Sequence, residues 1–215
     1  MARPTDPDRI REIRVGEGRI AVRLKEAAID RLAIGFCKAL DRHEVGYAIV
    51  GGYSAILLGR PRESDDVDII ASSMTFGAFA ALHRSIVRTF ECLTPGEPLG
   101  IYTDYLAAGA ESTALRYARP GTFVPNIEFK FAKKLLDHRA VRRRIPLSLN
   151  GHPLSIAPLE MQIGYKLYMG SPKDFEDARW IYQVAGERLD EGEIWRTAEA
   201  LGISRAKGRR VLGVR

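Results

Sequence analysis

The sequence feature that most constrains the fold is a pair of glycines between a short apolar run and a helix-like segment. Residues 47–50 read Tyr-Ala-Ile-Val, which is typical of a buried strand, and residues 53–58 can form a helix. Gly51 and Gly52 therefore lie where the strand turns into the helix. Glycine lets a ligand approach the backbone closely, and the free N–H groups at a helix start favour a phosphate. The pattern predicts a phosphate-binding strand–turn–helix unit.

Two carboxylates follow the glycines after 13 intervening residues. In the segment Asp-Val-Asp-Ile-Ile-Ala, strand alternation places Asp66 and Asp68 on one face and Val67 on the other. Two carboxylates so placed can share a Mg²⁺ ion, which proteins bind through one or two carboxylates and the phosphates of a substrate. Each element alone has a plainer interpretation, the glycines as a turn and the aspartates as a solvated strand end. Their pairing and spacing favour a functional site.

These residues carry a resemblance to a known family. The segment from Val50 to Ile69 resembles the signature of the nucleotidyltransferase superfamily, whose members have the DNA polymerase beta-like fold. Arg62 and Ser64 resemble the Arg-x-Thr run that precedes the aspartates in the minimal, stand-alone and AbiEii-like toxin branches, with serine in place of threonine. Further along, the pattern of Lys166 followed by Lys-Asp-Phe-Glu-Asp at 173–177 resembles two more elements of those branches.

The resemblance implies a fold and a reaction. The expected fold is α/β (α+β): a mixed sheet flanked by helices over residues 1–156, followed by a C-terminal helical appendage over residues 157–215. The implied reaction transfers a nucleoside monophosphate from an NTP to an acceptor hydroxyl and releases pyrophosphate. Asp66 and Asp68 are implied ligands of Mg²⁺ or Mn²⁺. A third carboxylate comes from an adjacent strand in this family, and Glu128 is the candidate because residues 126–130 form a strand signal, although the family more often has aspartate there.

Further site roles follow from the same resemblance. The residues expected to contact the NTP are Gly51, Gly52, Ser54, Arg62, Ser64, Lys166 and Asp174. Lys166 would reach the triphosphate, with Asp174 or Asp177 orienting it, and the alternative is a structural salt bridge between Lys166 and the helix that follows. Asp174 also has a plainer interpretation as a capping residue, since Ser171 is the expected N-cap of that helix and Pro172 its first residue.

The positive charge of the chain is unevenly distributed. Residues 130–144 carry a net charge of +6, which equals the net charge of all 215 residues. Such a concentration attracts polyanions, so Arg142, Arg143 and Arg144 are candidates for binding an RNA or tRNA acceptor. The alternative is a solvated helix face whose buried side comprises Leu135, Leu136, Ala140 and Val141.

The remaining pattern predicts the other elements. Hairpins are expected at residues 12–24 and 146–156, and helices at 25–44, 76–88, 172–185 and 190–201, with helical sequence also directly after Pro158. Residues 97–125 are irregular and rich in Gly and Pro. Trp180 and Trp195 are expected in the core, and the basic residues from 205 onward are a candidate disordered tail.

Composition restricts the class of protein. No apolar stretch approaches the ~20 residues of a membrane span, and residues 1–8 lack the apolar core of a signal peptide, so we expect no membrane and a cytoplasmic location. Cys37 and Cys92 are too few for a disulfide framework. Asn and Gln occur only twice each, which suggests a thermophile. Arginine outnumbers lysine 25 to 8, a bias that a GC-rich genome gives equally well.

Two classes of function stay open. The first is the enzyme, in the form of a general nucleotidyltransferase or of a toxin with an antitoxin partner that modifies RNA, tRNA or protein. The second is a catalytically silent module of the same fold that binds RNA or a partner protein. Intact Asp66 and Asp68 favour the enzyme, because a binding module has no use for two adjacent carboxylates without counter-charge.

Overall fold

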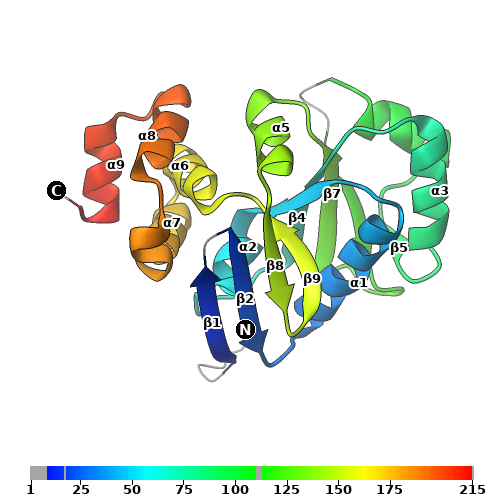
Figure 1. The fold of residues 1–215 in the computed structure, drawn as a ribbon. Coiled ribbons are helices and arrows are strands. Elements are labelled where there is room, and N and C mark those ends of the chain that lie inside the picture. The colour runs from blue at the N-terminus through cyan, green and yellow to red at the C-terminus, as the bar shows by residue number, and fades with distance from the viewer. Residues whose placement is uncertain (1–8, 17, 110–112, 215) are drawn as a thin grey trace.

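The described residues form one mixed sheet with helices on both faces (Figure 1). This computed structural model describes residues 9–16, 18–109 and 113–214. Within them the sheet has nine strands, in the order β1-β2-β8-β9-β3-β4-β7-β6-β5. The strands are β1 (Ile10–Gly16), β2 (Arg19–Leu24), β3 (Tyr47–Val50), β4 (Asp66–Ala71), β5 (Glu91–Cys92), β6 (Leu115–Ala118), β7 (Asn126–Phe131), β8 (Ile145–Leu149) and β9 (His152–Ile156). The expected α/β fold class is confirmed.

The register of three central strands determines which side chains meet. Strands β3 and β4 are antiparallel, with Val50 opposite Asp68, and β4 and β7 are parallel, with Asp68 opposite Glu128. Strand β6 is antiparallel to β7 and places Arg116 opposite Glu128. Directly opposed residues point to the same face of a sheet. Asp68, Glu128 and Arg116 therefore lie in a row across one face.

The opposite face of these strands is the main hydrophobic core. Ile49, Val67, Ile69, Ile127 and Phe129 are fully buried there. This face is covered by helices α1 (Ala28–Arg42), α2 (Gly51–Leu57) and α3 (Phe76–Ile86). Alternation in β4 and β7 thus separates an apolar side from a side that carries charged residues.

The charged face is covered by a smaller apolar cluster. Ala48 of β3 and Ile70 of β4 pack there with Ala140, Ala157 and Met161. Ala140 belongs to α5 (Leu135–Arg142), and Met161 belongs to α6 (Leu159–Met169). Only part of this face is filled, and the remaining space is the cleft described below.

Four helices follow the last strand and form the left side of Figure 1. Helix α6 packs against both α7 (Pro172–Ala185) and α8 (Glu191–Ala200). Its contact with α8 is close, because a Cβ on Gly164 would lie 2.8 Å from the Cβ of Thr197. The last helix is α9 (Arg205–Leu212). The expectation of a disordered tail is therefore wrong: a Cβ on Gly208 would lie 2.7 Å from the Trp195 ring, so glycine lets α9 pack tightly against α8.

Other expectations need correction. Residues 97–125 contain strand β6, the short helix α4 (Pro98–Ile101) and a π-helical turn at Tyr102–Leu106. Trp195 is buried, but Trp180 is only partly buried, and its ring N–H donates to the Leu58 carbonyl at 2.8 Å. Leu135 is 75% exposed because it begins α5 and points away from the core. In the described part of the chain, no helix has the length and apolar character needed to cross a membrane.

Candidate active site

A cleft of about 340 Å³ lies between the charged face of the sheet and helices α5 and α6. Most of the residues predicted to act together line it. They are Gly51, Gly52, Arg62, Ser64, Asp66, Asp68, Lys166 and Asp174. Segments far apart in the chain therefore converge on one surface, as the sequence pattern predicts.

The first glycine is required by its backbone and by its neighbour. Gly51 has φ +73°, a left-handed conformation that favours glycine, and a Cβ there would lie 2.0 Å from Oδ2 of Asp68. Gly52 contacts a different group, since a Cβ added at Gly52 would lie 2.0 Å from Nη2 of Arg62. The two glycines thus hold a carboxylate and a guanidinium directly against the backbone of the turn.

The two aspartates differ in their surroundings. Asp66 accepts a hydrogen bond from Ser64 Oγ at 3.0 Å. Burial raises the pKa of Asp68 to about 6, with further contributions from the negative charges of Asp66 and Glu128, while Lys130 and Lys166 act in the opposite direction. The negative charge around Asp68 is therefore only partly neutralised by the nearby lysines.

This electrostatic imbalance fits a divalent cation. Asp66 and Asp68 share a strand face beside the glycine turn, and a cation between them would relieve their mutual repulsion. Mg²⁺ commonly binds through two carboxylates and completes its shell with substrate phosphates and water. Among the described residues, no group of three or more His, Cys, Asp or Glu side chains is arranged to hold a metal. The donor set that fits is therefore two aspartates plus the phosphates of a substrate.

Glu128 lies on the predicted face but does not line the cleft. Its Oε1 accepts two hydrogen bonds from Arg116, from Nη2 at 2.7 Å and from Nε at 3.0 Å. Its charge nevertheless reaches Asp68, whose pKa it helps to raise. Glu128, the candidate third carboxylate, is thus opposite Asp68 in the neighbouring strand and paired with an arginine.

Lys166 belongs to a buried ionic cluster centred on Asp177. Asp177 has no exposed side-chain surface and accepts from Lys166 Nζ at 2.6 Å. It also accepts two bonds of 3.0 Å from Arg62 and pairs with Arg60. Burial lowers the pKa of Lys166 to about 8, partly offset by Asp174, whose Oδ1 lies 3.8 Å away. Lys166 therefore makes the structural salt bridge and also lines the cleft.

Asp174 has the capping position expected for it. Ser171 is the N-cap of α7, and its Oγ accepts from the Asp174 backbone N–H at 3.2 Å. The same hydroxyl donates to Asp174 Oδ2 at 2.5 Å. The second oxygen of Asp174 is the one that faces Lys166.

Several residues of the predicted site lie outside the cleft. Ser54 is fully buried in α2 and does not line it. The three arginines at 142–144 are exposed at the end of α5 and do not line it either. Arg143 pairs with Glu193 of α8 at 2.9 Å, and Arg144 donates to the Val141 carbonyl.

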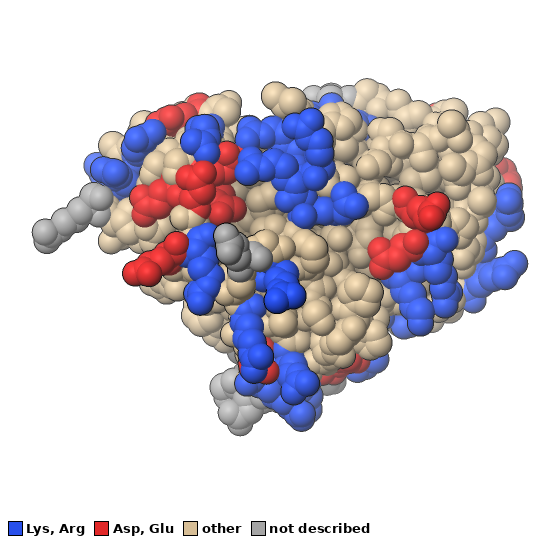
Figure 2. Space-filling view, viewed as in Figure 1, with Lys and Arg blue, Asp and Glu red and all other residues tan. Residues whose placement is uncertain are grey.

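Figure 2 shows Lys and Arg side chains gathered over the region of α5, beside an acidic group over the C-terminal helices. Glu193 of α8 links the two regions, because it accepts from Arg139 at 2.5 Å as well as from Arg143. Arg196 of its own helix is a third partner, at 3.0 Å. The basic segment is therefore neutralised in part by the protein itself.

Sequence reasoning missed other residues that line the cleft. Lys130 follows Glu128 by two positions in β7, so strand alternation alone would have placed it on the same face. Gln162, Tyr165 and Thr197 line the cleft from α6 and α8. These three had no signal in the sequence, because their position depends on how two helices pack.

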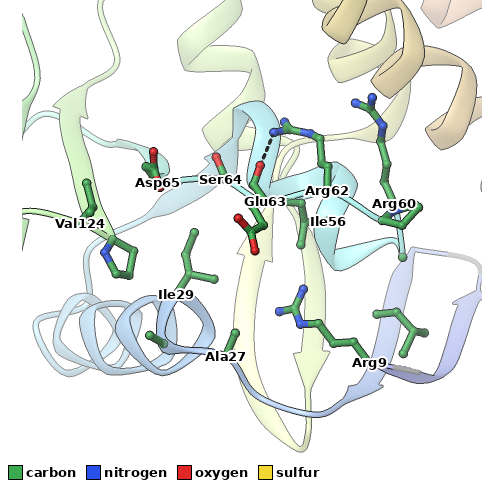
Figure 3. A pocket seen from close by; sticks show the side chains of 15 residues that line it. Arg9, Ala27, Ile29, Ile56, Arg60, Arg62, Glu63, Ser64, Asp65 and Val124 are labelled. Carbon is green, nitrogen blue, oxygen red and sulfur yellow. Dashed lines mark hydrogen bonds between the residues drawn. The ribbon is translucent and has the colours of Figure 1, made fainter. Parts of the chain in front are cut away.

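A second pocket, of about 300 Å³, lies on the other side of the loop that carries Arg62 and Ser64 (Figure 3). Its walls include Ile29 and Ile56, with Arg9 and Glu63 among its charged residues. Arg9 pairs with the buried Asp30. The loop therefore separates the cleft from a mostly apolar pocket beneath it.

Comparisons with known proteins identify the fold. No family model and no curated protein matches the sequence. A nucleotidyltransferase-like antigenic protein from Paracoccidioides brasiliensis superposes with a TM-score of 0.53 at 20% identity, covering 87% of this chain and 93% of that one. The antibiotic-resistance factor ANT(2'')-Ia superposes with a TM-score of 0.51 at 12% identity, covering 82% and 93%. The chain therefore has the fold of the nucleotidyltransferase superfamily.

Proposed function

We propose that this protein is a metal-dependent nucleotidyltransferase that moves a nucleoside monophosphate from an NTP to an acceptor hydroxyl. The observation that carries the proposal is the contact of the Asp68 carboxylate with the backbone of Gly51. It joins a metal-binding group to a turn that a phosphate can approach. The fold shared with nucleotidyltransferase-like proteins supports the same reaction class.

Each side of the cleft has a part in this proposal. Asp66 and Asp68 would hold Mg²⁺ or Mn²⁺, and Ser64 orients Asp66 through its hydrogen bond. The bound metal would stabilise the charge that develops on the transferred phosphoryl group. Gly51 and Gly52 let the Asp68 carboxylate and the Arg62 guanidinium lie against the backbone of the turn where the triphosphate would bind, and Arg62 and Lys166 supply positive charge.

The buried Asp177 positions those two cations. It holds Arg62 through both of its oxygens and Lys166 through one. A side chain fixed in this way loses little further freedom when a phosphate arrives. Asp177 is thus a positioning residue in the proposal.

The acceptor belongs to the same proposal. RNA, including tRNA, is supported by the basic character of residues 130–144, of which Lys130, Leu136, Asp137 and Ala140 line the cleft. A protein acceptor, and a toxin with an antitoxin partner, are the further forms of the proposal that the sequence resemblance implies. All of them use the same metal and nucleotide site.

Calorimetry with an NTP and Mg²⁺ tests the nucleotide site. We expect NTP binding that needs the metal and that Asp66→Ala or Asp68→Ala abolishes. Glu63→Ala is the matched control, because Glu63 is an exposed carboxylate on the loop directly before β4 and does not line the cleft. If both aspartate variants remain folded and bind like the wild type, the active-site assignment is wrong.

A labelling experiment then tests the reaction. The protein is incubated with each labelled NTP, with Mg²⁺ or Mn²⁺ and with total RNA, and the labelled macromolecule is identified. The pairing of Glu128 with Arg116 favours the second candidate, a silent module, because it occupies the third carboxylate. Metal-dependent NTP binding followed by labelling of any acceptor would exclude that candidate, and RNA binding without labelling would support it.

A further inference from the structure

The floor of the cleft changes character along strand β4. Asp66, Asp68 and Ile70 are successive residues on its charged face, so Ile70 lies about 7 Å beyond Asp68. Around Ile70 the cleft is walled by the apolar cluster that includes Ala140 and Met161. The cleft therefore has a charged part at the aspartates and an apolar part further along the strand.

Two buried polar side chains line the cleft without satisfying all their hydrogen-bonding groups. Gln162 is 5% exposed and Thr197 is fully buried. The amide nitrogen of Gln162 donates to the Ala157 carbonyl at 3.0 Å, and its Oε1 has no hydrogen-bond partner among the described residues. Thr197 Oγ1 also has none there. A buried polar atom left in this state costs roughly 1–3 kcal/mol, so both oxygens are suited to a ligand that donates hydrogen bonds.

An aromatic ring stands at the edge of the same space. Tyr165 is 46% exposed and lines the cleft from α6, one turn after Met161 and one turn before Met169. A ring half open to solvent beside an apolar wall offers a face on which a flat heterocycle can stack. Tyr168 has a similar exposure of 49% and a ring 5.9 Å away, but it does not line the cleft.

We propose that the apolar part of the cleft binds the base of the nucleoside triphosphate and prefers a base with an amino group at purine C6 or pyrimidine C4, that is, adenine or cytosine. The inference rests on the proposed function, because it assigns the substrate of that same site. The base stacks on Tyr165, and its amino group donates to Gln162 Oε1 and Thr197 Oγ1. Uracil and hypoxanthine carry an oxo group at the corresponding position. This oxo group and Gln162 Oε1 are both acceptors, so they would face each other without forming a hydrogen bond.

Matched pairs of nucleotides test the preference. We expect calorimetry with Mg²⁺ to show ATP binding more tightly than ITP, and CTP more tightly than UTP, on the order of tenfold for one lost hydrogen bond in a buried site. Inorganic tripolyphosphate is the probe for the charged part alone. In Gln162→Met, which conserves size, the preference should fall toward unity while tripolyphosphate binds unchanged. Thr197→Val should weaken both members of each pair alike, because a hydroxyl can accept from an amino group or donate to an oxo group.

Tyrosine variants test the stacking separately. Tyr165→Ala should weaken all four nucleotides by roughly tenfold, the usual loss for one base–aromatic stack, and Tyr165→Phe should retain their binding. Tyr168→Ala is the control and should change nothing. Because Tyr165 is half-exposed, its variants keep the test valid even where a buried Gln162 or Thr197 variant fails to fold.

The outcomes separate this inference from the proposed function. Nucleotides that bind no more tightly than tripolyphosphate, or that show equal affinities for both members of each pair, would overturn the base site and leave a transferase indifferent to the base. Preferences that survive in a folded Gln162 variant would also overturn it. Absence of binding by every nucleotide and by tripolyphosphate would instead reject the proposed function itself.

Discussion

Replacing Asp68 with asparagine should stabilise the metal-free protein, although Asp68 belongs to the proposed site. The pKa of this carboxyl is raised from 3.8 to about 6, mainly by burial. A rise of about two units corresponds to roughly 3 kcal/mol. The folded protein therefore holds the Asp68 proton more tightly than the unfolded chain does, and ionisation of this group opposes folding.

The sign of the pH dependence follows from that difference. Protonation of Asp68 favours the folded state fully below its ordinary pKa of 3.8, and this benefit is lost as the pH rises through about 6. Asparagine carries no charge at any of these pH values. We therefore expect Asp68→Asn to raise the free energy of unfolding by up to about 3 kcal/mol at pH 8 and by about half of that at pH 5.

Urea unfolding in the presence of EDTA, at pH 8, 6.5 and 5, measures this effect by linear extrapolation. Asp65→Asn is the control: Asp65 is an exposed neighbour outside the cleft, and its replacement should change stability by less than about 0.5 kcal/mol. Adding Mg²⁺ should then stabilise the wild type more than Asp68→Asn, because only the folded wild type has the complete site. A variant that is less stable at pH 8, or a gain that is the same at every pH, would refute the reasoning.

Three further predictions concern the residues around the cleft. If Glu128 is the third metal ligand, Glu128→Gln should lower the labelled-transfer rate by at least about tenfold, and Arg116→Met, which frees the carboxylate, should tighten Mn²⁺ binding. If neither change affects transfer or metal binding, the site has two carboxylates. Changing residues 142–144 together to alanine should flatten the salt dependence of RNA binding in a filter-binding assay, because fewer counterions are released, and NTP binding should stay nearly unchanged. If the RNA affinity is unaltered, a protein or small-molecule acceptor is favoured. Asp177→Ala should cost about 3–5 kcal/mol in urea unfolding because it leaves buried cations unpaired, whereas Glu176→Ala should cost less than about 1 kcal/mol; equal losses would show that Asp177 is not the centre of the cluster.

The central part of the site is predictable because it depends on local rules. Strand alternation places Asp66 and Asp68 on one face, and the turn geometry demands glycine at Gly51. The same alternation applied to β7 predicts the face of Glu128, and applied two residues further it would have predicted Lys130. These arguments need only the period of a strand and the position of its neighbours.

The partners of these residues are less predictable. Arg116 lies in a four-residue strand within a segment rich in Gly and Pro, so nothing local marks it as the partner of Glu128. Arg62 and Asp177 are 115 positions apart in the chain, and their pairing depends on how α7 packs against α2 and α6. The helix that begins at Arg205 is not predictable for a similar reason, since it is stabilised by contact with Trp195 and not by its own composition.

The two buried carboxylates of the C-terminal helices have a consequence for synthesis of the chain. Asp177 and Glu193 neutralise arginines that lie earlier in the sequence, in the loop before β4 and in α5. A ribosome releases those arginines well before it releases either carboxylate. Once residue 156 has been made, the described strands of the sheet are all present, but the arginines of the loop and of α5 still lack these carboxylates, and the wall of the cleft formed by α6 is not yet in place. If the proposed function holds, a partly made chain would attract polyanions without holding a nucleotide in position, and the ability to discriminate between the two would arise only when the last helices dock.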